Sequence, residues 1–170
     1  KVARDRYLIS PFCFAKITEK SSIKPQDVVL LVGSNYGYES AIISKISSAV
    51  MALEEDINFH KQADINIKTN LIDNVVNING AFFKGSEKFS PFDVIILLGS
   101  GKNPSDELLH QLANNGKLMI CENYNANLDE SKLFMYTKTN KNIFKEFICD
   151  LNIPKLIFDE EHRNTFSLEN

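Results

Sequence analysis

The sequence contains no tryptophan, only three cysteines, and no apolar run long enough to span a bilayer. Its net charge is −3 over 170 residues, so no excess of positive charge is present to attract nucleic acid or an anionic membrane. The longest apolar runs, such as Val94–Leu98, are far shorter than the roughly 20 residues of a membrane-spanning helix. We therefore expect neither nucleic acid nor a membrane as a partner.

Metal-binding residues are equally sparse. The cysteines and histidines are scattered along the chain, at Cys13, Cys121, Cys149, His60, His110 and His162. They form no CxxC pair and no mixed cluster with the spacing of a metal site, so the sequence predicts no metal ion. An odd number of scattered cysteines is typical of free thiols in a reducing compartment, and we expect a cytoplasmic protein.

The most informative stretch is Val28–Asp56, VVLLVGSNYGYESAIISKISSAVMALEED. An apolar run, Val28–Val32, is followed by a turn with two glycines, a helix-like segment and a second apolar run, Val50–Leu53, which ends at Glu54. This order of strand, glycine turn, helix, strand and acid is the layout of a nucleotide-binding βαβ unit. It predicts a small-molecule site where the first strand ends.

The turn itself reads Gly33-Ser34-Asn35-Tyr36-Gly37. Glycine lets the backbone turn tightly and approach a ligand without a Cβ in the way. A dinucleotide site needs the pattern G-x-G-x-x-G, and the third glycine of that pattern is missing here. A G-x-G-x-G turn instead suits S-adenosylmethionine, whose amino-acid tail lies against the turn. An ordinary strand-to-helix turn is the alternative that the glycines alone leave open.

The acid after the second strand narrows the choice. Glu54 directly follows this strand, where a carboxylate can accept hydrogen bonds from both ribose hydroxyls of an adenosine. Glu55 and Asp56 are adjacent, so the position could shift by one residue. The acidic cluster could also cap the next helix, a role that is compatible with ribose binding.

Helices and strands alternate through the rest of the chain. We expect helices at 11–20, 38–47, 56–65 and 104–112, parallel strands at 28–32, 49–53, 75–78, 92–98 and 117–121, and an antiparallel hairpin at 133–138 and 142–149. The fold class is therefore α/β. Because crossovers between parallel strands are right-handed, the glycine turn should lie at the switch point of the sheet, where ligands bind.

The chain is long enough for one domain with its own core, and no repeat or Pro/Gly-rich linker divides residues 1–170. Within it we expect an N-terminal helical segment at 1–24, a cofactor-binding core at 25–121 and C-terminal strands at 131–158, followed by a polar, exposed tail at 159–170. Because the chain begins with Lys1 rather than methionine, we also expect that a segment is missing before it.

Three further features have local roles. Ser10-Pro11 predicts a helix N-cap followed by proline at the first helical position. Asp93 opens the strand at 92–98 and is expected to bond a neighbouring backbone rather than to act in catalysis. The loop Gly99–Pro104 follows the carboxyl end of the same strand and should border the ligand cleft.

Together these segments resemble the protein-L-isoaspartate O-methyltransferases, a family of class I S-adenosylmethionine-dependent enzymes, and in particular its divergent bacterial members. The matching segments, in family order, are Arg6–Pro11, Val28–Tyr38, Val50–Asp56, Asn74–Gly80, Ser90–Ile96 and Leu108–Ile120. The most specific stretches are VGSNYGY, AVMALEED and SPFDVIILLGS followed by QLANNGKLMI. The resemblance implies a Rossmann-like, mostly parallel seven-stranded sheet with helices on both faces and antiparallel last strands.

The resemblance also implies roles for single residues. The residues expected to contact the cofactor are Gly33, Ser34, Asn35 and Gly37 on its methionine side with Tyr38 next to them, Glu54 at the ribose with Glu55 beside it, and Gly80 and Ala81 near the adenine. The family places an acid after the glycine at the last of these positions. Here that pair reads Gly80-Ala81, which leaves backbone atoms to contact the adenine.

Two other departures concern the turn and the acceptor. Asn35 replaces the middle glycine and adds a side chain close to the cofactor. The family's substrate loop is represented only by Tyr7–Pro11, in which Ser10 matches the family serine near the acceptor carboxylate with a one-residue gap. Ser10 is the candidate catalytic residue, as a hydroxyl that positions the acceptor, and a plain helix cap is its alternative.

The first hypothesis is therefore an S-adenosylmethionine-dependent methyltransferase that acts in protein repair, on a carboxylate such as an L-isoaspartyl residue of a protein or peptide. A carboxylate is already ionised at neutral pH, so alignment and exclusion of water would suffice. We favour a monomer. A degenerate methyltransferase fold with weak or no catalysis, acting as a binding module, is the second hypothesis, and a nicotinamide-dependent oxidoreductase is the third.

Overall fold

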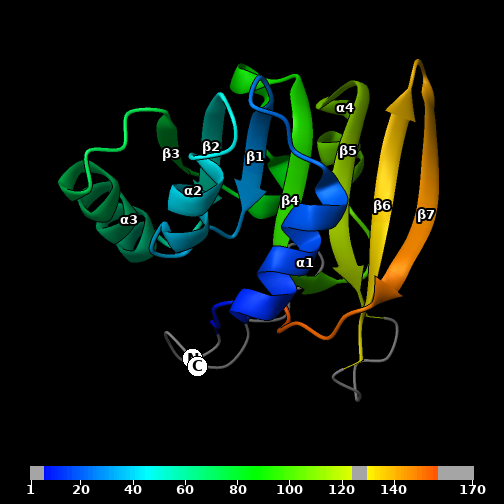
Figure 1. Cartoon of the computed structure of the whole chain (residues 1–170), viewed down its shortest axis with the longest axis horizontal. Coiled ribbons are helices and arrows are strands. Elements are labelled where there is room, and N and C mark those ends of the chain that lie inside the picture. Colours follow the sequence, from blue (N-terminus) through cyan, green and yellow to red (C-terminus); the bar gives the residue numbers. More distant parts are fainter. Residues whose placement is uncertain (1–5, 124–129, 157–170) are drawn as a thin grey trace, which may run out of the picture.

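Seven strands form one sheet in the order β3-β2-β1-β4-β5-β6-β7 in the computed structural model, which describes residues 6–123 and 130–156 (Figure 1). The elements are α1 (Pro11–Ser21), β1 (Val28–Val32), α2 (Tyr38–Ile43), β2 (Ala49–Glu54), α3 (Ile57–Thr69), β3 (Val75–Asn79), the 3-10 turns η1 (Phe82–Lys84) and η2 (Glu87–Phe89), β4 (Phe92–Gly101), α4 (Asp106–His110), β5 (Leu112–Glu122), β6 (Lys132–Thr139) and β7 (Asn142–Asp150). Strands β1 to β5 pair in parallel, whereas β6 is antiparallel to both β5 and β7. The predicted α/β sheet with an antiparallel hairpin at one edge is confirmed.

Strand β1 lies in the interior of the sheet. Residues 29–32 have no solvent exposure, and Leu31 pairs with Ala52 of β2 on one side and Ile96 of β4 on the other. Burial on both faces explains why this strand is apolar at every position rather than at every second one. The start of the strand is held by Asp93, whose Oδ2 accepts a hydrogen bond from Val28 N at 2.9 Å, as predicted.

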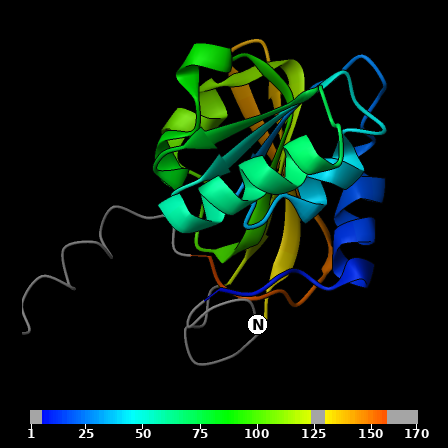
Figure 2. The same cartoon turned by 90° about the vertical axis from the view of Figure 1, so that its left-hand side faces the viewer.

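Helical segments cover both faces of the sheet. Phe14 and Ile17 of α1 and Ile43 of α2 belong to the core on one face, together with Leu31 and Ile96. The core on the opposite face includes Phe82 of η1 and Leu108 of α4. Figure 2 shows this layering, with α1 on one side of the sheet and the segment that carries η1, η2 and α4 on the other.

The helix starts follow the predicted capping residues. Ser10 Oγ accepts a hydrogen bond from Cys13 N at 3.2 Å, and Pro11 begins α1. Asp56 caps α3 by accepting from Asn58 N at 2.7 Å and Phe59 N at 3.3 Å. These bonds satisfy backbone donors that an α-helix leaves unpaired in its first turn.

Two helices are shorter than predicted. Helix α2 ends at Ile43, and Ser44 and Ser47 turn their hydroxyls back onto the carbonyls of Ala41 and Ile43. Such bonds compete with helix continuation. Helix α4 spans only residues 106–110, because Gln111 O already accepts from Phe92 N and residue 112 pairs with the start of β4.

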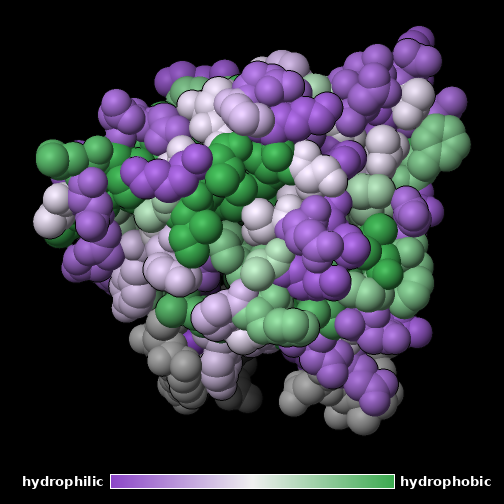
Figure 3. Space-filling model, viewed as in Figure 1, coloured by the Kyte–Doolittle hydropathy of each residue, from purple (hydrophilic) through white to green (hydrophobic). Residues whose placement is uncertain are grey.

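The outer hairpin is the least covered part of the sheet. Ile143, Phe144 and Phe147 of β7 are all more than one third exposed. Figure 3 shows apolar side chains at the surface over this hairpin and near α2. No helix in the described ranges, 6–123 and 130–156, is long and apolar enough to cross a membrane. The predicted polar tail at 159–170 lies outside those ranges.

The three cysteines are free, and Cys121 is fully buried. Burial raises the pKa of the Cys121 thiol to about 12, with the Cys13 and Cys149 thiols nearby adding to the rise. Within the described part of the chain, no group of three or more His, Cys, Asp or Glu side chains is placed to hold a metal ion.

A buried polar cluster joins β5 to the hairpin. Glu122 has no solvent exposure, and its two carboxylate oxygens accept from the Tyr136 hydroxyl and from Lys145 Nζ, the latter at 2.6 Å. Burial and the hydrogen bond to Glu122 raise the pKa of Tyr136 to about 12. Lys145 also lies 4.2 Å from the centre of the Phe134 ring. The pairing offsets part of the cost of burying a carboxylate.

We predict that Glu122→Ala lowers the free energy of unfolding by about 3 kcal/mol, since it leaves a buried hydroxyl and a partly buried ammonium without their acceptor. Glu122→Gln keeps an acceptor for Tyr136 and should cost about half as much. Urea unfolding followed by circular dichroism measures both. The control is Asp150→Ala, whose carboxylate is 80% exposed and 3.9 Å from Lys132, and which should cost less than about 0.5 kcal/mol. Equal losses for Ala at 122 and 150 would contradict the prediction.

Candidate cofactor site

The carboxyl ends of β1 and β4 lie next to each other at the point where the strand order reverses. From β1 the chain continues to β2 and β3 on one side, and β4 and β5 lie on the other. Open parallel sheets bind ligands at such switch points. The glycine turn after β1, Glu54 at the end of β2, and Gly99 and Ser100 of β4 all belong to this edge.

The glycine turn has the left-handed backbone that its sequence predicts. Gly33 and Gly37 have φ angles of 84° and 85°. Asn35, between them, has φ 48°, a conformation that asparagine tolerates better than most residues. The residue that replaces the middle glycine therefore keeps a glycine-like backbone. Its side chain amide donates to Gly33 O at 3.1 Å and so braces the turn.

Glu54 is completely buried, with its carboxylate turned towards the glycine turn. Asn35 N donates to its Oε2 at 2.9 Å, and Asp56 N donates to its Oε1 at 3.0 Å. A side chain at the end of β2 thus reaches the loop after β1, as the ribose-binding interpretation requires. The sequence could not decide between residues 54 and 55, and the structure places residue 54 against the turn.

Arg6 is the main partner of that carboxylate. Its Nη1 donates to Glu54 Oε1 at 3.0 Å and its Nη2 to Oε2 at 2.6 Å, a two-pronged pairing. The same Nη2 donates to Asn35 Oδ1 at 3.0 Å. The guanidinium carbon is 5.2 Å from the ring centres of both Phe59 and Phe82. Arg6 therefore occupies the space beside the Glu54 carboxylate, with only 17% of its side chain exposed.

Leu156 packs against the glycine turn and the end of β4. The segment before it runs along the end of β4, where Ser100 N donates to Pro154 O at 2.8 Å and Leu156 N donates to Ser100 O at 2.9 Å. A Cβ built on Gly33 would lie 2.7 Å from Leu156 Cδ2, and one on Gly99 would lie 2.3 Å from Leu156 Cβ. Both glycines are needed because the leucine packs directly on their Cα atoms.

Comparison with known proteins gives the family. The family model for protein-L-isoaspartate(D-aspartate) O-methyltransferase matches residues 1–149. The chain belongs to this family. A protein-L-isoaspartate O-methyltransferase of Aliivibrio fischeri is 28% identical over 94% of this chain and 74% of its own length, and one from Helicobacter pylori is 32% identical over 67% of this chain and 54% of its own. The chain is thus shorter than these relatives.

Solved structures show the same fold. A protein-L-isoaspartate O-methyltransferase structure has a TM-score of 0.82 at 20% identity, and the match covers 98% of this chain but 58% of the other. A Plasmodium falciparum protein of the same description, solved with S-adenosyl-L-homocysteine, has a TM-score of 0.74 at 24% identity over 94% of this chain and 79% of the other. The fold is therefore that of class I methyltransferases, with the sheet that the resemblance implied.

The chemistry of the site residues suits the family's cofactor, but Arg6 and Leu156 already lie against them. The turn, the buried carboxylate of Glu54 and the hydroxyl of Ser34, which is buried and lacks a hydrogen-bond partner among the described residues, form a suitable donor and acceptor set. The space in front of them is taken by Arg6 and Leu156, which come from the segments before α1 and after β7. Each of these side chains therefore lies against a residue that the sequence predicts to contact the cofactor.

The other predicted cofactor residues lie around this edge. Gly80 N donates to Glu54 O at 3.1 Å, and Ala81 precedes η1, whose Phe82 contacts Arg6. The Glu55 carbonyl accepts from Asn79 Nδ2 at 3.1 Å. These positions are compatible with the predicted roles of Gly80, Ala81 and Glu55, which stay predictions.

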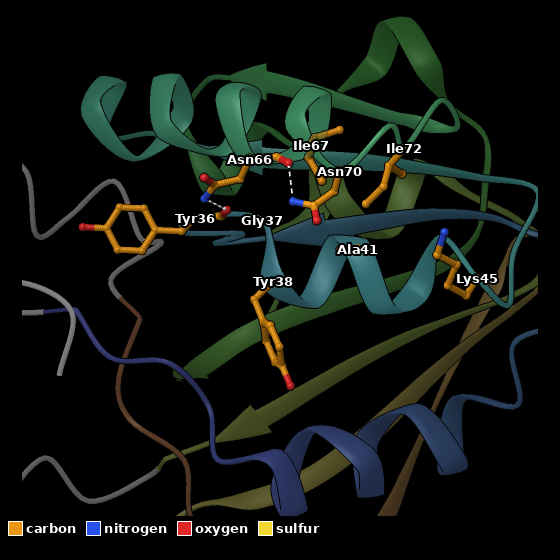
Figure 4. Close-up of a pocket in the computed structure, with 9 residues that line it drawn as sticks. All are labelled: Tyr36, Gly37, Tyr38, Ala41, Lys45, Asn66, Ile67, Asn70 and Ile72. Carbon is orange, nitrogen blue, oxygen red and sulfur yellow. Dashed lines mark hydrogen bonds between the residues drawn. The ribbon is translucent and has the colours of Figure 1, made fainter.

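Tyr38 lies further from the cleft. It begins α2, its ring is 53% exposed, and Figure 4 shows it pointing away from α3 towards α1. A hollow of about 530 Å³ is lined by residues of α2, of α3 and of the end of the glycine turn, among them Gly37 and Tyr38. Figure 4 shows these residues. Asn66 of α3 closes one part of the hollow by donating to Tyr36 O at 2.9 Å. Glu54 does not line this hollow, and the cofactor contact of Tyr38 stays a prediction.

Sequence reasoning missed the two side chains that fill the cleft. Arg6 lies in a matched segment but is separated from Glu54 by 48 positions, and nothing in its neighbourhood signals an acidic partner. Leu156 follows a proline in a stretch without periodicity. The available signal was a pair of opposite charges: an arginine lies in the segment before the first helix, and an acid follows the second strand.

Glu39 is a buried acid in the first turn of α2. Its side chain is 1% exposed, and its Oε2 has no hydrogen-bond partner among the described residues. Burial raises the pKa of this carboxyl from near 4.5 to about 7, partly opposed by a bond from its own backbone N–H. An acid whose pKa is raised by folding stabilises the fold only while protonated. Its contribution is full below pH 4.5 and is lost as the pH rises to about 7.

We predict that Glu39→Gln, a neutral substitute, raises the free energy of unfolding at pH 8 by roughly 2 to 3 kcal/mol and leaves it unchanged near pH 4.5. Urea titrations at several pH values measure this. Exposed Glu107→Gln on α4 is the matched control and should follow the wild-type profile. If the Glu39→Gln and wild-type profiles run parallel between pH 4 and pH 8, the carboxyl is ionised in the folded protein and the prediction is wrong.

Proposed function

We propose that this chain is an S-adenosylmethionine-dependent protein-L-isoaspartate O-methyltransferase. Membership of the family supports the activity. The observation that carries the proposal at the level of this site is the position of Glu54, a buried carboxylate at the end of β2 that is hydrogen-bonded to the left-handed turn after β1. That arrangement supports the proposal, because a carboxylate at the end of β2 can accept hydrogen bonds from ribose hydroxyls and the adjoining turn can lie against the methionine part of the cofactor.

The cofactor would be held by three parts of the chain. The Glu54 carboxylate would accept the ribose hydroxyls, with Glu55 beside it. Backbone and side-chain atoms of Gly33–Gly37 would line the methionine part, and Ser34 would gain a partner for its buried hydroxyl. The adenine would lie near Gly80 and Ala81, where main-chain atoms replace the acid that other members carry.

The chemistry asks little of the protein in acid or base catalysis. When bound, the cofactor supplies a methyl group on a sulfonium, which is open to displacement by a nucleophile. The acceptor carboxylate is ionised at neutral pH, so its oxygen needs no base. The residues of the site therefore have to align the acceptor and exclude water. No histidine or cysteine is required in this mechanism.

Ser10 remains the proposed acceptor-positioning residue. It is exposed, and its Oγ is used as an acceptor by Cys13 N at 3.2 Å. A hydroxyl that accepts one hydrogen bond still has its own O–H to donate. Ser10 can therefore cap α1 and donate to a substrate carboxylate at the same time.

The wider role follows from the activity. The substrate would be a protein or peptide that contains an isoaspartyl residue, and the purpose would be protein repair. We propose a cytoplasmic location on the basis of the three free cysteines, and a monomer. These assignments depend on the activity rather than on contacts at the site.

The decisive measurement is calorimetric titration with S-adenosylhomocysteine. We expect detectable binding, and a loss of roughly 1–3 kcal/mol for Glu54→Ala, the scale for leaving hydroxyl partners unpaired. Exposed Glu107→Ala should bind like wild type. In parallel, methyl transfer from labelled S-adenosylmethionine should occur to an isoaspartyl peptide and not to the same peptide with normal aspartate. No heat of binding at high protein concentration would favour the degenerate fold instead.

A further inference from the structure

We propose that this protein closes its own cofactor cleft with an internal ligand: Arg6 takes the place of the ribose and Leu156 that of the methionine part, so that cofactor binding requires both terminal segments to move away. This inference rests on the proposed function, and adds to it a form of regulation at the same site. It makes Arg6 a competitor of the cofactor rather than a contact of it.

The contacts of Arg6 reproduce those of an adenosine. A ribose offers two neighbouring hydroxyl donors to a carboxylate, and Arg6 offers two neighbouring N–H donors to the same oxygens, at 3.0 and 2.6 Å. The guanidinium is flat and lies near two aromatic rings, Phe59 and Phe82, each centred 5.2 Å from its central carbon. The guanidinium thus offers a pair of donors, as the ribose of an adenosine does. It also offers a flat face beside aromatic rings, as the adenine does.

The two side chains lie near the two ends of the described chain, and Leu156 also packs in the apolar core on the face that carries η1 and α4. Arg6 precedes α1, and Leu156 follows the hairpin. The Leu156 segment is held to the sheet by an isolated parallel bridge at Ser100, with hydrogen bonds of 2.8 and 2.9 Å. Short segments with few backbone bonds open at lower free energy than the strands they cover. Opening the cleft would therefore break the packing of Leu156 and its bonds to Ser100, and would leave the pairing between β1, β2 and β4 in place.

The reason for closure is the buried carboxylate. An ionised side chain without solvent exposure is costly unless it is paired, and Glu54 has no exposure. In the absence of a ligand, Arg6 supplies the pairing. A ligand that pairs with the same oxygens must first displace Arg6. Its apparent dissociation constant is therefore the intrinsic constant divided by the fraction of protein molecules in which Arg6 is displaced.

The test is titration of four variants with S-adenosylhomocysteine. Arg6→Ala should bind about tenfold tighter than wild type, because the competitor is gone. Arg6→Lys, which keeps the charge but cannot make the two-pronged pairing, should lie between them. Leu156→Ala should also bind tighter. Lys16→Ala, which removes a charge of α1 that pairs with Glu19 at 3.2 Å, is the matched control and should not change the affinity.

A substitution at Glu54 tests whether Arg6 competes with the cofactor or contacts it. In the wild-type background, Glu54→Gln weakens the binding of the cofactor and also the pairing of Arg6 with residue 54. Part of its effect on the measured affinity therefore cancels. In the Arg6→Ala background only the cofactor is weakened, and the same substitution should therefore cause a larger fold-loss of affinity. Thermal unfolding without ligand shows that each variant is folded. Arg6→Lys keeps the test valid if Arg6→Ala is too unstable to titrate.

Hydrogen exchange gives a readout that needs no catalysis. Addition of S-adenosylhomocysteine to the wild type should speed exchange at residues 7–9 and 153–156 while it slows exchange at the glycine turn. Weaker binding by Arg6→Ala, or slower exchange at residues 7–9, would mean that Arg6 contacts the ligand, and would overturn the inference. Equal affinities of wild type, Arg6→Ala and Leu156→Ala would overturn it while leaving the proposed function intact. No binding by any variant would overturn both.

Discussion

The pairing of Arg6 with Glu54 organises the carboxyl edge of the sheet. Glu54 receives four hydrogen bonds, from two nitrogens of Arg6 and from the backbone of Asn35 and Asp56. These bonds tie the segment before α1, the glycine turn and the start of α3 to a single carboxylate. Because that carboxylate is completely buried, each partner is needed to offset the cost of removing its charge from water. The site is therefore one electrostatic unit rather than a set of separate loops.

Departures from the family pattern do not dismantle this unit. Asn35 takes the place of a glycine yet adopts a left-handed backbone, and its side chain binds both Gly33 O and Arg6. Its amide thus helps to hold the arginine over Glu54. Asn35 departs from the glycine of a standard cofactor turn, and its side chain provides a hydrogen-bond acceptor for Arg6. The divergence at residue 35 and the presence of Arg6 are in this sense one feature.

The scaffold and the occupants of the cleft differ in how they are held. Strands β1, β2 and β4 are buried on both faces and paired along their length. Leu156 is held by packing in the core on the η1 and α4 face, by its contacts with Gly33 and Gly99 and by one bridge at Ser100. Arg6 is held by side-chain contacts and an isolated backbone bridge. A rigid sheet edge with removable contents is what a binding site at a switch point requires. Membership of a methyltransferase family and a filled cleft are therefore compatible.

Short-range pattern predicted most of the fold. Continuous apolar runs identified the parallel strands, since burial on both faces leaves no polar positions, and Ser10 and Asp56 marked helix starts because their side chains bond the first turn. Helix ends were predicted less well. The hydroxyls of Ser44 and Ser47 and the contact of Gln111 with Phe92 decide them, and these depend on competition between local bonds and on tertiary pairing.

For the site, the turn and the acid at residue 54 could be read from the sequence because a strand-to-helix turn and a strand end are local features. What fills the space between them could not. Arg6 and Glu54 are 48 positions apart, and Leu156 reaches Gly33 only after the chain has passed through all seven strands. Contacts of that separation are set by the folded geometry and by the cost of burying an unpaired charge, and no periodicity in the sequence encodes them.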